Sequence, residues 1–307
     1  MFNEQRKRQF LAEREDKAVV SNNIYDTFRL ATDFEEKYNR DLCEWNSSEI
    51  IEFYKYYSTP RVQTLILVHS YLTMYTNWCI SNGMVSDNQN HYSEINSEML
   101  CKCINMNALR ESVFSKDKLF EALKEIPNYC DRYLILGSFE GIPIKNDCMY
   151  SAKVSDIHDG NILRLVDGND IKISKELMQV MITAAEEDSR LSLTSVPKTF
   201  MYEYTDGDHI IRDIQRRSAR VNHTVTIGTR LRKCGDYLGM PSLTFKALAE
   251  SGRMWFISEI AKSKSVSVED AVIKYRKEHE DRYGKMQNTV TYLNTYGLLI
   301  REMYGCD

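Results

Sequence analysis

The sequence predicts a mainly helical protein with a small β-sheet, divided into two domains. The chain has 307 residues, which is too long for one small core. It contains only five prolines and thirteen glycines, so few positions interrupt a helix. Short β-prone pieces cluster between residues 149 and 174. We place the two domains at residues 1–100 and 101–307.

The first domain is expected to contain only helices. Residues 24–38 carry apolar side chains at helical spacing, behind a predicted cap at Ser21 or Asn22. Pro60 stands at the first turn of the longest helix, which is predicted to end at Gly83. The pattern weakens after this helix, and residues 91–111 are read as the linker. The expected helices are 3–20, 24–38 with Ile24, Phe28, Ala31 and Phe34 on its apolar face, 49–57 with a cap at Ser47 or Ser48, and 61–83.

The second domain is expected to combine helices with a three-stranded sheet. Asp159-Gly160 and Asp167-Gly168 provide the turns between β-prone pieces at 149–157, 161–168 and 169–174. A further strand and turn are predicted within 199–210, and Gly252 is expected to separate two short helices. The expected helices are 115–126, 128–141, 175–187, 224–239, 243–252, 253–265, 267–285 and 287–305.

Composition argues against several classes of protein. No apolar run approaches the roughly 18 residues that span a bilayer. Residues 1–16 are charged throughout and lack the apolar core of a signal peptide. The eight cysteines are scattered, and Cys101-x-Cys103 has no second pair or nearby histidines to complete a zinc site. We therefore expect reduced, mostly buried thiols, no metal or cofactor, no membrane contact and a cytoplasmic location.

A basic block extends from Arg212 to Lys264. It contains eleven Lys and Arg residues against four acids, a local net charge of +7 in a chain whose total is −4. Such segregation is typical of a surface that binds a polyanion. A solvated helical face whose cations pair with acids elsewhere would give the same composition. Charge alone does not decide between these interpretations.

The order of the elements resembles the tyrosine recombinase (phage integrase) family over nearly the whole chain. Residues 22–90 look like its four-helix, SAM-like core-binding domain, and the residues from about 112 onward look like its catalytic domain. There, YLILGSFEGIPIKNDCMYSAKVSDI is similar to the family's helix, glycine turn and strand ending in Asp. ALAESG is similar to the helix before its last two. Tyr275, in DAVIKYRKE, falls where the family has its nucleophile.

The residues at the family's catalytic positions differ from those that the chemistry requires. Strand exchange needs two arginines that clamp the scissile phosphate, besides the tyrosine and a lysine. The first position reads EGIPIKND, with Lys145 but no arginine, and the second reads GMPSLTFK, without His or Arg. His209-Ile-Ile-Arg212 lies at least one helix too early, and Lys172 is read as an exposed strand lysine or as the family's hairpin lysine. We expect no enzymatic activity.

A recombinase scaffold with a basic face but without this clamp resembles a narrower family. These are the lytic-cycle (master) repressors of SPbeta-like temperate phages, the MrpR type. The resemblance rests on the chain length, the core-binding segment and the run from Arg216 to Gly252. It implies a non-catalytic, sequence-specific repressor that binds a double-stranded DNA operator and maintains lysogeny, associated with the nucleoid of a bacterial host.

DNA contacts are expected from both domains. The helix at 224–239 should bury Ile227, Leu231, Cys234 and Leu238 and present a polar face to a groove, although an ordinary surface helix has the same pattern. The N-terminus of the helix at 61–83 favours phosphate. The predicted DNA-contacting residues are Arg61, Gln63, Thr64, Arg217, Arg220, Asn222, His223, Thr226, Thr229, Arg230, Lys233, Lys246 and Arg253.

Two other functions stay open at this point. An active tyrosine recombinase or integrase would use Tyr275 as its nucleophile. An architectural or partner-binding protein would dock its terminal helix, residues 287–305, on another chain or on a second copy of itself. Self-association through that helix is compatible with DNA binding.

Overall fold

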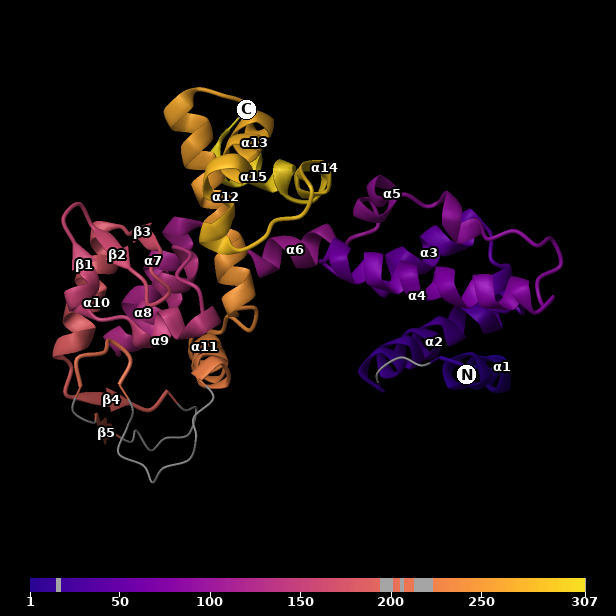
Figure 1. Ribbon diagram of the computed structural model, residues 1–307, viewed down its shortest axis with the longest axis horizontal. Helices are drawn as coiled ribbons and strands as arrows, with labels where there is room; N and C mark the ends of the chain where they lie inside the picture. The colour runs from indigo at the N-terminus through magenta and orange to yellow at the C-terminus, as the bar shows by residue number, and fades with distance from the viewer. Residues whose placement is uncertain (15–17, 194–200, 205–206, 213–222, 307) are drawn as a thin grey trace. The chain divides into compact units, whose positions relative to one another are not determined.

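The computed structural model describes residues 1–14, 18–193, 201–204, 207–212 and 223–306 (Figure 1). The chain divides into two compact units, residues 1–110 and 111–307. The predicted boundary at residue 100 lies earlier than this division. Residues 101–110 belong with the first unit, where the Asn105 amide donates to the carbonyl of Thr59 at 2.9 Å. All the strands of the described chain lie in the second unit, which agrees with the predicted mainly helical fold.

The first unit is built from helices only, within its described residues. Ile24, Phe28, Ala31 and Phe34 are buried in its core, as the helical spacing predicted. Two predictions were wrong here, the single helix over residues 3–20 and the helix cap at Ser21 or Asn22. Helix α2 begins at Ala18 and runs through Ser21 and Asn22. The helices are α1 (Glu4–Ala12), α2 (Ala18–Tyr38), α3 (Ser47–Tyr57), α4 (Val62–Ser81), α5 (Ser97–Cys101) and α6 (Met106–Ser112), which crosses into the second unit.

Helix α3 is capped by Asn46 and not by the predicted Ser47 or Ser48. The Asn46 side chain accepts hydrogen bonds from the amides of Ser48 and Glu49, at 3.0 and 3.1 Å. The Glu49 carboxylate accepts the Asn46 amide in return, at 2.9 Å. This reciprocal pair satisfies two donors that a helix start leaves open, so the start of the helix moves back to Ser47. At the end of α4, Gly83 adopts the positive φ expected of a helix stop.

A buried ion pair fastens α1 to the rest of the first unit. The Lys7 ammonium lies 2.6 Å from Oε1 of Glu35 on α2, and neither side chain is exposed to solvent. The same carboxylate oxygen accepts the backbone amide of Leu42 at 3.0 Å. Burial raises the pKa of Glu35 to about 7, although Lys7 opposes this shift. On α1, Arg6 also pairs with Asp41, at 3.5 Å.

Replacing Lys7 with methionine is expected to lower the free energy of unfolding by about 3–5 kcal/mol at pH 8, because it leaves Glu35 buried without its partner. The loss should be smaller at pH 5. The folded-state pKa of Glu35 is raised above its ordinary value, so its protonation stabilises the fold at low pH, and that stabilisation is lost as pH rises through about 7. Urea unfolding followed by circular dichroism measures both effects.

The double variant Lys7→Met/Glu35→Leu should recover most of the stability, since no buried charge is then left alone. Lys37→Met is the matched control. Its partner is Glu52, and both side chains of that pair are 52% exposed. Loss of an exposed pair is expected to cost at most about 1 kcal/mol. If Lys7→Met and Lys37→Met lowered the free energy of unfolding equally, the buried Lys7–Glu35 pair would contribute no more to stability than the exposed pair.

The second unit is organised around α8 (Tyr129–Phe139), whose residues from Cys130 to Phe139 are buried except for Arg132. Helices α10, α11 and α12 pack against it from different parts of the sequence. The core therefore depends on contacts that are distant along the chain. The other helices are α7 (Lys116–Glu125), α9 (Cys148–Ser151), α10 (Lys175–Glu186), α11 (His223–Leu238), α12 (Phe245–Lys264), α13 (Val268–His279), α14 (Thr289–Tyr292) and α15 (Leu298–Tyr304), with a π-helical turn, η6 (Leu293–Gly297), between the last two.

A three-stranded antiparallel sheet with the order β1-β2-β3 covers part of this unit, as predicted. Gly160 and Gly168 lie in its two turns with φ of +80° and +86°, a conformation that favours glycine. The predicted strand at 149–157 was mostly wrong, because residues 148–151 form α9 and only Ile157 of this range pairs in the sheet. A separate two-stranded sheet joins β4 and β5. The strands are β1 (Ile157–His158), β2 (Ile162–Arg164), β3 (Asp170–Lys172), β4 (Ser189–Leu191) and β5 (Met201–Glu203).

Helix α12 is continuous, so the predicted break at Gly252 was wrong. Gly252 is buried in the middle of the helix, where α12 approaches the end of α8. A Cβ atom at this position would lie far inside the van der Waals distance of the Phe139 carbonyl oxygen and would also meet the ring of Tyr283. The glycine therefore serves close packing between two helices, a role that has the same local sequence signal as a helix stop.

Candidate DNA-binding surface

Helix α11 carries four of the predicted DNA-contacting residues whose side chains the structure describes, namely Thr226, Thr229, Arg230 and Lys233. Ile227, Leu231 and Cys234 on its core face are buried, as the spacing predicted, whereas Leu238 at the end of the helix is only half-buried. On the opposite side Lys233 is exposed, and Thr226 and Thr229 are half-buried. Arg232 is also exposed, although it was not among the predicted contacts. The described part of α11 is thus an amphipathic helix whose outer face holds two cations and two hydroxyl groups.

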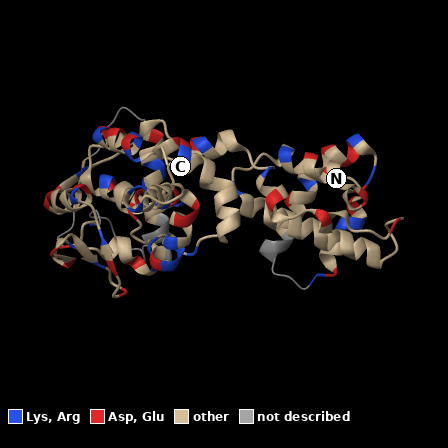
Figure 2. Ribbon diagram, turned by 90° about the horizontal axis from the view of Figure 1, so that it is seen from above, with Lys and Arg blue, Asp and Glu red and all other residues tan. Residues whose placement is uncertain are grey.

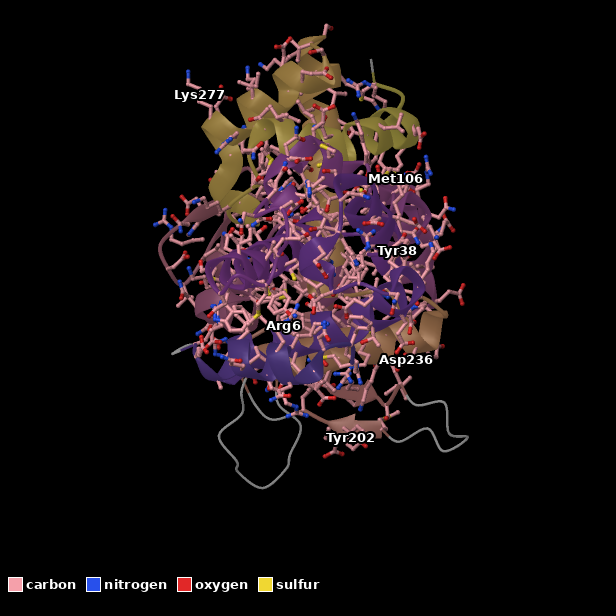
Figure 3. The ribbon with its side chains drawn as sticks, turned by 90° about the vertical axis from the view of Figure 1, so that its right-hand side faces the viewer. Arg6, Tyr38, Met106, Tyr202, Asp236 and Lys277 are labelled. Atoms are coloured by element: carbon pink, nitrogen blue, oxygen red, sulfur yellow. The ribbon has the colours of Figure 1, made fainter. Side chains whose placement is uncertain are left out.

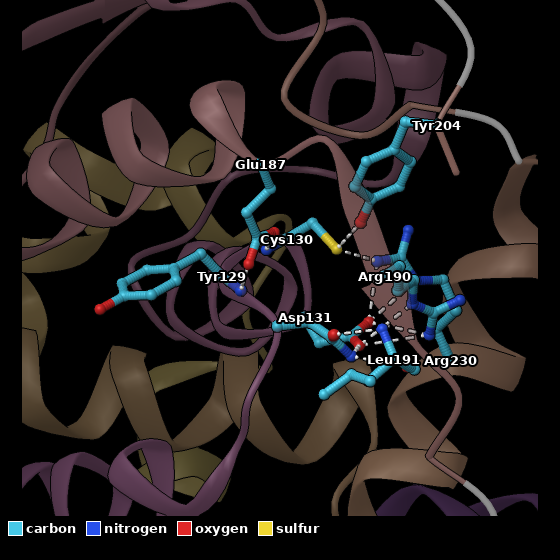
Figure 4. Close-up of polar contacts among 9 residues, drawn as sticks. Tyr129, Cys130, Asp131, Glu187, Arg190, Leu191, Tyr204 and Arg230 are labelled. Atoms are coloured by element: carbon cyan, nitrogen blue, oxygen red, sulfur yellow. Dashed lines mark hydrogen bonds and ion pairs between the residues drawn. The ribbon is translucent and has the colours of Figure 1, made fainter. Parts of the chain in front are cut away.

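Arg230 was predicted on this outer face, and the structure corrects that prediction. Only 6% of Arg230 is exposed, and its guanidinium donates to Oδ1 of Asp131 on α8, at 2.9 Å from Nε (Figure 4). Position 230 is three residues from Ile227 and four from Cys234, so it belongs to the buried stripe of the helix. An arginine is tolerated there because Asp131, itself fully buried, supplies the opposite charge.

The same carboxylate binds a second arginine. Arg190 on β4 donates to both oxygens of Asp131, at 3.1 and 3.2 Å. Burial alone would raise the pKa of Asp131, but Arg230 and Arg190 outweigh it and hold the pKa below its ordinary value. The Cys130 thiol lies 2.8 Å from the Arg230 guanidinium and 2.5 Å from the hydroxyl of Tyr204. This network (Figure 4) ties α8, α11 and the β4–β5 hairpin together.

Arg253 was also predicted to contact DNA and is instead buried, with 7% of its surface exposed. Its guanidinium pairs with Glu250 at 2.9 Å and donates to the carbonyl of Tyr283 at 2.8 Å. These bonds join α12 to the segment after α13. The prediction failed because of the helix phase. Arg253 lies between Gly252 and Met254, which are both buried, so this part of α12 faces the core. Lys246, in the first turn of α12, is exposed.

Several predicted contacts lie outside the described residues. They are Arg217, Arg220, Asn222 and the side chain of His223, whose backbone begins α11. In the described chain, cations and acids are interspersed along both units (Figure 2).

In the first unit the predicted contacts lie at the start of α4. Arg61 is the N-cap residue of α4, and its side chain makes no capping hydrogen bond. Arg61 and Gln63 are exposed, and Thr64 is half-buried. The first turn thus presents polar side chains beside the backbone amides of a helix N-terminus, an arrangement that favours a phosphate group.

Some of the positions that resemble a recombinase active site line a cleft of about 1070 Å³ in the second unit. Lys145, from the segment at the first catalytic arginine position, lines it together with Lys172 of the β-hairpin, and the segment at the second arginine position contributes Phe245. Tyr275 is fully buried and lies behind Phe256, with 6.1 Å between ring centroids, outside the residues that line the cleft. Burial raises the pKa of Tyr275, while Arg253 opposes the shift. A buried, protonated phenol is a poor nucleophile.

His209 and Arg212 have structural partners, in agreement with their early place in the sequence. Nδ1 of His209 lies 3.1 Å from the carbonyl of Ser151. The Arg212 guanidinium bonds the carbonyl of Glu187, at the end of α10, and lies 4.8 Å from the centre of the Tyr204 ring. Neither His209 nor Arg212 lines the cleft.

The residues that hold the surface together were not found from sequence. Asp131 and Arg190 are isolated polar residues in apolar or unremarkable segments. One signal was present, since an acid inside the apolar run of α8 needs a buried partner. All eight cysteines are free thiols and seven are buried, as expected. Among the described helices, none is long and apolar enough to cross a membrane.

Comparison with known proteins agrees with this architecture. Residues 1–81 match the family model described as MrpR, N-terminal core-binding domain, and residues 113–298 match MrpR, C-terminal catalytic domain. The chain is also similar to the SPbeta prophage-derived uncharacterized protein YopR of Bacillus subtilis (strain 168). The identity is 21% over 280 residues, which cover 87% of this chain and 84% of YopR. The chain belongs to the MrpR family, with a core-binding domain followed by a catalytic domain of the tyrosine recombinase type.

Proposed function

We propose that this protein is a sequence-specific double-stranded DNA-binding repressor that maintains a prophage in the lysogenic state, in the cytoplasm of its bacterial host. The observation that carries the proposal is the outer face of α11, where Arg232 and Lys233 are exposed beside Thr226 and Thr229. The segment that leads into this helix adds further arginines in the sequence. Cations that contact phosphates, together with hydroxyl groups that reach base edges, are the side chains that a groove-entering helix uses.

The first unit supports the same function through its family match and its chemistry. A core-binding domain implies DNA binding. At the start of α4, Arg61 and Gln63 are exposed beside a helix N-terminus. Two DNA-binding units on one duplex would together supply more phosphate contacts than either alone, and affinity rises with their number. The bound form would then involve both domains.

We further propose that the protein does not catalyse strand exchange. The support comes from the cleft and from Tyr275. Among the described residues that line the cleft, the one arginine is Arg282, which follows α13 and does not come from either segment that resembles a catalytic arginine position. Tyr275 is buried away from it. Without a phosphate clamp, a recombinase loses the electrostatic stabilisation on which phosphoryl transfer depends. Self-association through the terminal helix, residues 287–305, stays a prediction.

Lys233→Gln is expected to weaken binding to operator DNA about 5-fold near 0.15 M salt and to reduce the slope of log affinity against log salt by roughly 1. The reason is the loss of one phosphate contact and its released counterion. Fluorescence anisotropy with labelled duplexes from prophage promoter regions, titrated at several salt concentrations, measures both quantities. Unrelated duplexes of the same length give the non-specific affinity.

Lys277→Gln is the matched control, because Lys277 extends from α13 into solvent (Figure 3) and is not part of the proposed surface. It should leave affinity and salt slope unchanged. The proposal fails if the unaltered protein binds no prophage duplex more tightly than unrelated DNA. A suicide DNA substrate should trap no covalent adduct, and an adduct on Tyr275 would refute the non-catalytic part alone.

A further inference from the structure

The cleft in the second unit has the size and lining of a small-molecule site. Its volume is about 1070 Å³, at the upper end of typical ligand pockets. One wall is aromatic and belongs to α12, with Phe245, Trp255 and Phe256. The facing walls come from the loop after α8, from β3 and from the segment after α13. None of the described lining residues lies on α11, whose outer face carries the proposed DNA contacts.

Glu140 joins three of these walls and makes the cleft preformed. Its carboxylate accepts the backbone amide of Ser174 at 2.8 Å and also bonds the Ser174 hydroxyl. Its backbone carbonyl accepts Nε of Arg282 at 2.8 Å. The Arg282 guanidinium lies 5.0 Å from the centre of the Phe256 ring, on the aromatic wall. Such fixed positions reduce the entropy that a ligand must overcome on binding.

The rim of the cleft includes a strained loop. Asn146 and Asp147 both have a φ of +58°, next to Lys145. Two consecutive residues other than glycine in the left-handed region cost free energy, and such segments cluster at sites that bind ligands. Lys145 and Asn146 line the cleft and are exposed.

The charges of the cleft indicate which ligand it fits. Among its described lining residues are four Lys or Arg side chains, four carboxylates and one histidine, His279. A DNA backbone is anionic along its whole length, so a surface that holds it is expected to have a clear excess of cations. Equal numbers of both signs instead fit a small molecule with an anionic group at one end and hydrogen-bond donors at the other.

We propose that this cleft binds a free nucleotide. Its phosphates would lie against Arg282, Lys172 and Lys145, since arginine and lysine bind phosphate strongly. Its ribose hydroxyls would donate to a carboxylate such as Asp167, as in other nucleotide sites. The base would pack against the aromatic wall and meet the amides of Asn146 and Asn169. This inference does not depend on DNA binding, so each proposal can fail without the other.

The test is isothermal titration calorimetry of the full chain with ATP, GTP and AMP, and with inorganic phosphate and adenosine as the two halves of the ligand. At least one nucleotide should bind with a Kd below about 100 μM, and each half should bind at least about 10-fold more weakly. The variant Lys172→Gln should weaken nucleotide binding by about 10-fold, through loss of a charge-assisted contact. Lys172 is exposed on β3, so its replacement should not affect folding.

Lys277→Gln again serves as the control, because Lys277 does not line the cleft. Two outcomes would overturn the proposal. One is the absence of heat from every nucleotide up to about 1 mM. The other is binding that Lys172→Gln and Arg282→Gln both leave unchanged. Weaker DNA binding by Lys172→Gln without any nucleotide binding would assign the cleft to the DNA backbone instead, and would equally refute the inference.

Discussion

Replacing Asp131 with asparagine is expected to lower the free energy of unfolding by about 3–5 kcal/mol, because it leaves the buried guanidinium of Arg230 and the half-buried guanidinium of Arg190 without their counter-charge. Arg230 and Arg190 both bind this carboxylate, and the Asp131 side chain is fully buried. The loss should also reduce DNA binding, since the bond to Arg230 fixes the position of α11 against the core. Urea unfolding measures the first effect and anisotropy measures the second.

The pH dependence of this contribution follows from the direction of the pKa shift. The folded-state pKa of Asp131 is depressed by its arginine partners. A depressed pKa means that the stabilisation is present above the unfolded-state value, about 4, and is lost as pH falls through the folded-state value. The stability difference between the unaltered protein and Asp131→Asn should therefore be constant from pH 6 to 8 and shrink in acid.

Asp170→Asn is the matched control, as it removes an exposed aspartate that also bonds an arginine through two hydrogen bonds. Arg164 donates to both of its oxygens at 2.9 Å, but the two side chains are 59% and 43% exposed. The expected cost is below about 1 kcal/mol. A similarly small cost for Asp131→Asn would mean that the buried network contributes little to holding α11.

The second large effect is expected from Gly252→Ala, which should destabilise the second unit by more than about 4 kcal/mol or prevent its folding. The new methyl group would collide with the Phe139 carbonyl, and backbone atoms of two packed helices have no rotamer that relieves the overlap. Expression yield, circular dichroism and thermal unfolding would show the effect. Changes in solvent conditions are not expected to restore the stability of Gly252→Ala, because the cause of its instability is a steric overlap.

Gly228→Ala tests the same substitution where space is available. Gly228 lies within α11, and an added Cβ there meets no atom within 4 Å. Alanine favours helix over glycine by about 1 kcal/mol, so this variant should be neutral or slightly more stable. Equal behaviour of Gly228→Ala and Gly252→Ala would show that α12 does not approach α8 as closely as the structure has it.

Local patterns were sufficient for most of the elements. Apolar side chains at helical spacing predicted the core positions of α2 and of α11, because burial requires one continuous apolar stripe. The Asp-Gly pairs predicted both turns of the sheet, since glycine accepts the positive φ that such turns use. These features depend on residues that are neighbours in the sequence, so a short segment contains all the information that determines them.

The errors share a different cause. Arg230 and Arg253 read as surface cations, and only the approach of Asp131 and of Glu250 makes their burial favourable. The sequence pattern at Gly252 predicted the end of a helix. Only the close approach of Phe139 shows that the glycine is needed for helix packing. In each case the deciding partner is a side chain or carbonyl that the sequence alone does not place.

The sequence by itself thus determined the helical class, the two-domain plan, the sheet turns and the amphipathic form of α11, because each follows from spacing within a short segment. The tertiary structure decided which cations face solvent, where Tyr275 lies and which segments meet at the cleft. Those outcomes depend on contacts between residues far apart in the chain, such as Asp131 with Arg230. The free energy of a buried charge is set by its partner and not by its own neighbours in sequence.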